Sequence, residues 1–281
     1  LVGSAPDNLD RYISPPLLVS NAGLAFTGGN DMVTLSGRLA YENSFSASSV
    51  QNGTPTAANS SLVKPERVTA YEVGYRGLVP AGESRITVDL SAYYNSYEDF
   101  ISGKNVIVPF YGTVGDNSLS LLALRNDDFQ VFQTYTNSAA DISSYGASIG
   151  LNTKILNGFD FGVSYTYAKF DFDQSTDPDF EAGFNTPEHK VKVQFGNTEL
   201  FKNFGFNVNA RYQSDYLWES TFLDATIESR IVVDAQINYT VPSIKSVFKL
   251  GGANLGGQEY FSAPGVGAIG SQYYISWTIN N

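Results

Sequence analysis

The sequence predicts an all-β fold, an antiparallel transmembrane β-barrel, and three observations support this class. Apolar and polar residues alternate with period two over segments of about ten residues. The connections between these segments alternate between short and long. No run of about 18 apolar residues is present, so no membrane-spanning helix is expected. A tilted strand of about ten residues is long enough to cross a bilayer.

The alternation is clearest in residues 85–95, which read RITVDLSAYYN. Val88 and Leu90 fall on one face, whereas Thr87 and Asp89 fall on the other. This pattern indicates a strand with one apolar and one polar face.

Similar segments recur along the chain, and about 11 strands are expected in total. In chain order the others are residues 17–26 (the weakest), 33–42, 67–79, 145–153, 159–168, 188–195, 204–213, 230–241, 246–254 and 272–280. The long polar connections are residues 44–65, 102–130, 172–186, 217–228 and 255–270. Short turns at one end and long loops at the other are typical of an outer-membrane barrel.

Charged residues lie in the middle of the polar faces, at Arg38, Glu72, Arg76, Asp89, Arg211 and Asp234. A dry core would not tolerate them, so they indicate a wide lumen that is filled by water or a plug. Tyrosines lie at the ends of many apolar faces, at Tyr41, Tyr75, Tyr94, Tyr145, Tyr167, Tyr212, Tyr239 and Tyr273. Such rings favour the two interfaces of a membrane, where they form girdles.

Composition argues against several functions. The net charge of -11 argues against nucleic acid as a partner, because phosphates require a basic surface. The chain has no cysteine and a single histidine, His189, which we interpret as a rim residue without a catalytic partner. We therefore expect no enzyme activity and no cofactor. The N-terminal residues have no basic n-region or apolar h-region, so no signal peptide is expected within this sequence.

Several segments carry a specific resemblance. Residues 62–77 read LVKPERVTAYEVGYRG, residues 90–101 read LSAYYNSYEDFI, and the last strand follows a glycine-containing loop in ANLGGQEYFSAPGVGAIGSQYYISWTIN. In their order and spacing these segments resemble TonB-dependent receptors. The last two residues depart from that pattern, because Asn280 and Asn281 stand where the family often ends on an aromatic residue.

The resemblance implies a 22-stranded barrel with an N-terminal plug, in the outer membrane of a Gram-negative bacterium. Residues 1–281 would be the C-terminal portion, without the plug and the early strands, so an unclosed sheet is expected. The implied function is binding of a scarce nutrient by extracellular loops and its energy-coupled import. The implied partners are outer-membrane lipid, the remainder of the receptor, TonB acting through the plug, and an imported ligand.

Several alternatives stay open. The first is a passive barrel or surface-binding protein without energy coupling, and a soluble antiparallel protein is a structural alternative. The imported ligand could be an iron chelate, cobalamin, a glycan or a peptide.

Candidate ligand contacts lie in the loops and the lumen. The loop 102–130 is partly apolar, which favours an ordered flap with a short helix over 118–126. Its candidate residues are Phe110, Tyr111, Arg125 and Asp127, and Trp218 is a candidate in a later loop. Arg38 and Arg211 would point into the lumen, where they either contact an anionic substrate or form ion pairs.

A weak metal site is a further hypothesis. Asp173, Asp177, Asp179 and Glu181 lie in one loop, and calcium prefers several oxygen ligands. The spacing does not match an EF-hand, so a solvated acidic loop is the alternative.

Overall fold

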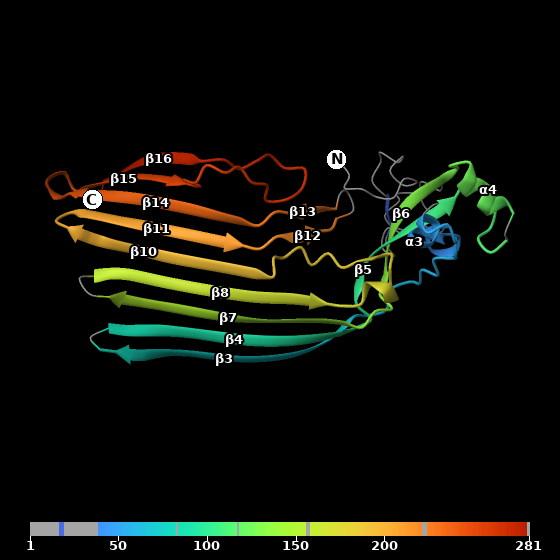
Figure 1. The fold of residues 1–281 in the computed structure, drawn as a ribbon, viewed down its shortest axis with the longest axis horizontal. Helices are drawn as coiled ribbons and strands as arrows, with labels where there is room; N and C mark the ends of the chain where they lie inside the picture. Colours follow the sequence, from blue (N-terminus) through green and yellow to red (C-terminus); the bar gives the residue numbers. More distant parts are fainter. Residues whose placement is uncertain are drawn as a thin grey trace.

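The computed structural model describes residues 17–19, 39–82, 84–116, 118–155, 158–220 and 224–279. Nine of the described strands form one antiparallel sheet, in the order β16-β15-β14-β11-β10-β8-β7-β4-β3, which we call the barrel sheet (Figure 1). They are β3 (Arg67–Ala81), β4 (Ser84–Glu98), β7 (Ile142–Ile155), β8 (Phe159–Asp171), β10 (His189–Phe201), β11 (Phe204–Gln213), β14 (Arg230–Val241), β15 (Ser246–Ala253) and β16 (Gln272–Ile279). These strands correspond to nine of the predicted segments. Strands β3 and β16 are the two edges, so the sheet is not closed, as predicted.

The strands pair in a register that places apolar residues beside apolar residues, and polar residues beside polar residues, across the sheet. One row of paired residues is apolar or aromatic throughout: Tyr75, Leu90, Ile149, Tyr165, Val191, Tyr212 and Ile231. A neighbouring row on the other face is polar or small: Gly74, Ser91, Ser148, Thr166, Lys190, Gln213 and Arg230. The sheet therefore has one apolar and one polar face, and much of the apolar face is uncovered, as the 81% exposure of Ile275 illustrates.

The connections are sorted by length. Short turns join β3 to β4, β7 to β8, β10 to β11 and β14 to β15 at one end of the sheet (Figure 1). Gly82 and Gly158 adopt φ values of +63° and +78° in two of these turns, a conformation that only glycine adopts without strain. A 3-10 turn, Pro242–Ile244, forms the connection between β14 and β15. All the long connections leave the opposite end.

The long connections build a second sheet, in the order β1-β6-β5-β2 with β9 also paired to β5, which we call the loop sheet. Its strands are β1 (Leu17–Val19), β2 (Phe45–Ser46), β5 (Ile101–Pro109), β6 (Phe129–Asn137) and β9 (Phe180–Glu181). Helices α3 (Ala47–Gln51) and α4 (Leu119–Arg125) accompany it, and a separate hairpin pairs β12 (Tyr216–Trp218) with β13 (Ala225–Ile227). A 3-10 turn, Gln174–Thr176, precedes β9.

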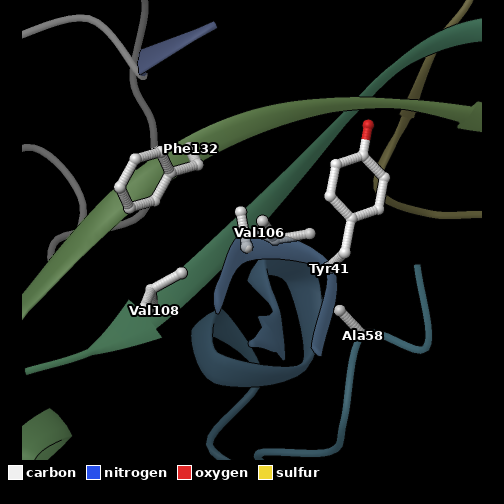
Figure 2. Close-up of a cluster of buried hydrophobic side chains, with 6 residues drawn as sticks. Tyr41, Ala58, Val106, Val108 and Phe132 are labelled. Carbon is white, nitrogen blue, oxygen red and sulfur yellow. The ribbon is translucent and has the colours of Figure 1, made fainter. Parts of the chain in front are cut away.

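The loop sheet is packed like the core of a soluble domain. Val106 and Val108 of β5 pack in one buried cluster, which also holds Tyr41 and Phe132 (Figure 2). Ile107, between those two valines, belongs to a second cluster with Phe45, Ala47 and Phe129. Successive residues of a strand point to opposite faces, so β5 is buried on both sides. This burial makes the long loops an ordered structure.

Two predicted strands are corrected. Of residues 17–26, only Leu17–Val19 are described, and they pair in parallel with β6 in the loop sheet. Of residues 33–42, positions 33–38 lie outside the described residues, and 39–42 are helical. Ala40 and Tyr41 are adjacent yet enter the same cluster, which a strand does not allow. Tyr41 is therefore no girdle residue: it is 9% exposed, and its hydroxyl donates to the Tyr135 carbonyl at 2.9 Å.

No helix among the described residues has the length and apolar character needed to cross a membrane.

We expect Phe180→Ala to destabilise the loop sheet by about 3–5 kcal/mol, because it leaves a cavity in a packed site. Phe180 is 2% exposed, and its ring lies 5.8 Å from that of Phe100 and 5.9 Å from that of Phe172. Hydrogen exchange of residues 101–137, followed with increasing denaturant, measures the loss. Phe110→Ala is the matched control, since Phe110 is 65% exposed and its loss should cost less than about 0.5 kcal/mol. Equal effects of the two substitutions would contradict this account of the core.

Candidate functional site

The loop 102–130 folds as an ordered unit, as the apolar content of its sequence predicts. It contributes most of β5, the whole of α4 and the start of β6. Helix α4 spans Leu119–Arg125, between the capping residues Ser118 and Asn126. The short helix expected over 118–126 is therefore confirmed.

The four candidate residues of this loop gather where α4 turns into β6. The backbone N–H of Phe110 donates to the carbonyl oxygen of Asp128 at 2.9 Å, and the Tyr111 hydroxyl donates to the Asp128 carboxylate at 3.0 Å. Asp127 forms the turn with a φ of +59°, and Arg125 is the last residue of α4. The Phe110 ring is exposed on this surface. A role of the group in ligand binding stays a prediction.

Trp218 belongs to a different loop. It is the last residue of β12 and pairs with Ala225 of β13, with its side chain half-buried. Figure 1 shows this hairpin beside the end of the barrel sheet, whereas α4 lies at the outer end of the loop sheet. The structure therefore places Trp218 in a second group of loop residues.

The lumenal arginines are engaged in ion pairs. Arg211 donates to the Asp234 carboxylate at 2.8 Å, and Nε of Arg76 donates to Asp89 at 2.6 Å. Both pairs join neighbouring strands on the polar face. Arg38 lies outside the described residues. Arg211 and Asp234 also line a cavity of about 440 Å³ on that face, together with Lys192, so a contact to substrate stays a prediction for Arg211.

The acidic loop 172–186 does not gather its carboxylates around one point. Asp177 is buried and forms an ion pair with Lys104 at 2.9 Å. Its second oxygen accepts hydrogen bonds from the Ser138 hydroxyl at 3.0 Å and the Ala139 N–H at 3.1 Å. Asp177 therefore ties the loop to β5 and to the chain after β6.

The other three carboxylates have separate partners. Asp173 caps the 3-10 turn through Ser175, and these hydrogen bonds lower its pKa. Asp179 accepts from the N–H of Ser48 at 2.6 Å, and Glu181 accepts from side-chain amides of β5 and β6. Among the described residues, no group of three or more His, Cys, Asp or Glu side chains is arranged to hold a metal ion.

His189 lies at the start of β10, near the mouth. Its Nδ1 is 2.9 Å from the Tyr165 hydroxyl, and its ring lies 5.3 Å from that of Tyr167. These contacts match a rim residue among aromatic side chains.

Two adjoining cavities between long loops were not anticipated from the sequence. One of about 510 Å³ is lined by Glu181, Glu219 and Asp224, and another of about 600 Å³ is lined by Phe170, Phe184 and Glu219. Burial raises the pKa of Glu181 to about 7, with a further increase from the charge of Asp224. Burial likewise raises the pKa of Glu219. The acidic character of residues 172–186 was a signal for this site, but its pairing with Glu219 required the fold.

Comparison with known proteins identifies the fold. The family described as TonB dependent receptor-like, beta-barrel matches residues 18–255. No curated protein matches the chain.

Among solved structures, 57 chains match. The structure of the FpvAI–pyocin S2 complex is 15% identical with a TM-score of 0.52, over 77% of this chain and 27% of that chain. The copper transporter OprC is 15% identical with a TM-score of 0.52, and the match covers 76% of this chain and 31% of that chain. The siderophore receptor PirA from Acinetobacter baumannii is 13% identical with a TM-score of 0.50, and the match covers 77% of this chain and 32% of that chain. The chain thus spans about a third or less of the length of these proteins, and the likeness is one of fold.

We expect Asp177→Asn to destabilise the loop sheet by about 3–5 kcal/mol, because it leaves the ammonium group of Lys104 without its partner. Adding Lys104→Met to the Asp177→Asn variant should recover most of the lost stability. Denaturant unfolding followed by hydrogen exchange of residues 101–109 measures both.

Asp116→Asn is the control, since Asp116 is exposed on the loop 102–130, which also holds Lys104. If millimolar calcium stabilised the wild type and Asp177→Asn abolished that effect, the ion-pair account would be wrong and the metal hypothesis favoured.

Proposed function

The chain belongs to the TonB-dependent receptor β-barrel family, and from this membership we propose that it forms the C-terminal portion of an outer-membrane receptor. The receptor binds a scarce nutrient through its extracellular loops and imports it by energy-coupled gating. The barrel sheet carries the proposal, because its two faces, its open edges and its sorted connections are those of one wall of such a barrel.

In this proposal the apolar face contacts lipid. The paired row from Tyr75 to Ile231 places large apolar or aromatic side chains side by side over seven strands. Burying such a face in hydrocarbon is favourable, whereas water would leave it exposed. The polar face, with the pairs Arg76–Asp89 and Arg211–Asp234, then lines the lumen.

The remainder of the receptor completes the barrel. The edges β3 and β16 offer unpaired backbone groups, which in hydrocarbon must be satisfied by further strands. A plug inside the lumen would connect the ligand site with TonB, which supplies energy from the inner membrane. The loop sheet forms the outer mouth, where the nutrient is captured.

The mechanism is binding and gating rather than bond chemistry. His189 contacts tyrosine rings, and the buried acids Asp177 and Glu181 are held by hydrogen bonds or an ion pair within the loops. Such contacts support rigid recognition of a ligand. The nutrients considered are iron chelates, cobalamin, glycans and peptides.

We expect Leu90→Arg to impair assembly of the complete receptor, because an arginine on the lipid face near the membrane centre costs about 2–4 kcal/mol. Ser91→Arg is the matched control, since Ser91 lies next along β4 and points to the polar face. The measurement is the fraction of receptor that shows heat-modifiable migration in an outer-membrane extract. Equal loss for both variants would argue against the assigned lipid face.

We expect uptake through the receptor to require TonB and the proton gradient. A strain that lacks the receptor gene should fail to grow on one limiting nutrient among the four classes, and the complete gene should restore growth. Deletion of TonB or addition of a protonophore should then abolish accumulation of the labelled nutrient. Accumulation that persists without TonB would instead favour a passive barrel.

A further inference from the structure

The two adjoining cavities form one cleft between residues 172–188 on one side and residues 214–219 and Asp224 on the other. The first is about 510 Å³ and the second about 600 Å³, and both are lined by Gln174, Leu217 and Glu219. Glu219 also joins the two loops, because its carboxylate accepts from the N–H of Gly183 at 2.8 Å. We call this space the acidic cleft. The volume of each cavity lies within the range of small-molecule sites.

The charge of the cleft has one sign. The carboxylates that line it are Asp179, Glu181, Glu188, Asp215, Glu219 and Asp224. Among the described residues, no lysine or arginine lines either cavity, and His189 is the one basic residue in the lining. The charges of Asp224 and Glu219 add to the effect of burial in raising the pKa of Glu181. These acids therefore repel one another, and a positive charge placed among them would relieve that repulsion.

Aromatic rings also line the cleft. Phe170, Phe172, Phe184 and Tyr216 line the larger cavity. The Phe170 ring lies 5.2 Å from that of Phe184, in a stacked arrangement, and 5.6 Å from that of Phe172. Rings of this kind attract a cation over their faces and bury an apolar body.

An unsatisfied acceptor lies in the same lining. Oδ1 of Asn105 is buried and accepts no hydrogen bond among the described residues, while its amide nitrogen donates to Glu181. A buried acceptor without a donor is costly. A donor group on a ligand bound in the cleft would satisfy this oxygen.

We propose that the acidic cleft binds an organic cation: an ammonium or guanidinium group on an aromatic or apolar body. The cation donates to the carboxylates of Glu181, Glu219 and Asp224, and its body packs against Phe170 and Phe184. Charge-assisted hydrogen bonds of this kind are stronger than neutral ones. The inference rests on the proposed function as a receptor, and it names the class of ligand that the loops recognise.

The test uses the complete receptor, purified in detergent, and three probes that share one ring. These are phenethylammonium, neutral N-acetylphenethylamine and anionic phenylacetate, with binding measured by calorimetry and saturation-transfer NMR. We expect the cation to bind about tenfold more tightly than either other probe, as one charged hydrogen bond would give. Equal affinities, or a preference for the anion, would overturn the proposal.

Variants locate the binding. Glu219→Gln and Asp224→Asn should each weaken the cation about five- to tenfold while keeping an acceptor oxygen. Phe184→Leu should weaken it about threefold by removing a ring face. Glu259→Gln is the matched control, since Glu259 is exposed on the separate loop 254–271. Heat-modifiable migration shows that each variant has folded. An equal loss with Glu259→Gln would overturn the site.

Calcium gives a competing outcome, because carboxylates also bind metal ions. If calcium bound in a Glu219-dependent manner and phenethylammonium did not, the site would be a metal site and the proposal wrong. Binding to the purified receptor does not need TonB. If the cation failed to bind while TonB-dependent uptake was intact, the proposed cation site would be wrong and the proposed function would stand. Cation binding without TonB-dependent uptake would refute the proposed function alone.

Discussion

The hydrogen-bonded register of the nine antiparallel strands is the constraint on which the rest of the structure depends. Each inner strand pairs with a neighbour on both sides, and such pairing is what a spanning sheet in hydrocarbon requires. Because side chains alternate along every strand, that register also aligns the apolar row from Tyr75 to Ile231 and the polar row beside it. The ion pair between Arg211 and Asp234 joins β11 to β14 within this frame.

The loops obey a different physical rule. β5 buries Val106 and Val108 on one face and Ile107 on the other, so the loop sheet has the interior of a small soluble domain. Polar residues at its margin are then fixed by specific contacts, as Asp177 is by Lys104. A rigid mouth of this kind holds the walls of the acidic cleft in place, and rigid walls lower the entropic cost of binding.

The sequence predicts the barrel strands well because a half-buried strand has a strong signal of period two, as residues 85–95 show. It also predicts α4, from an apolar stretch within a long loop. The sequence does not predict β5. A strand that is buried on both faces has a continuous apolar run, here Val106–Pro109, in place of the alternation of period two. The acidic cleft escapes prediction for another reason: Glu181 and Glu219 meet only when two loops come together, and no local pattern encodes that distance.

The period of two also limits how this protein can change. One residue added within a barrel strand would exchange the inner and outer faces from that point to the end of the strand, where each side chain would meet the wrong surroundings. The turns at Gly82 and Gly158 leave little more freedom, because they already use the left-handed conformation. The long connections lie outside this frame. Changes of length there leave the register of the barrel strands intact, so that one wall can acquire new recognition surfaces without being rebuilt.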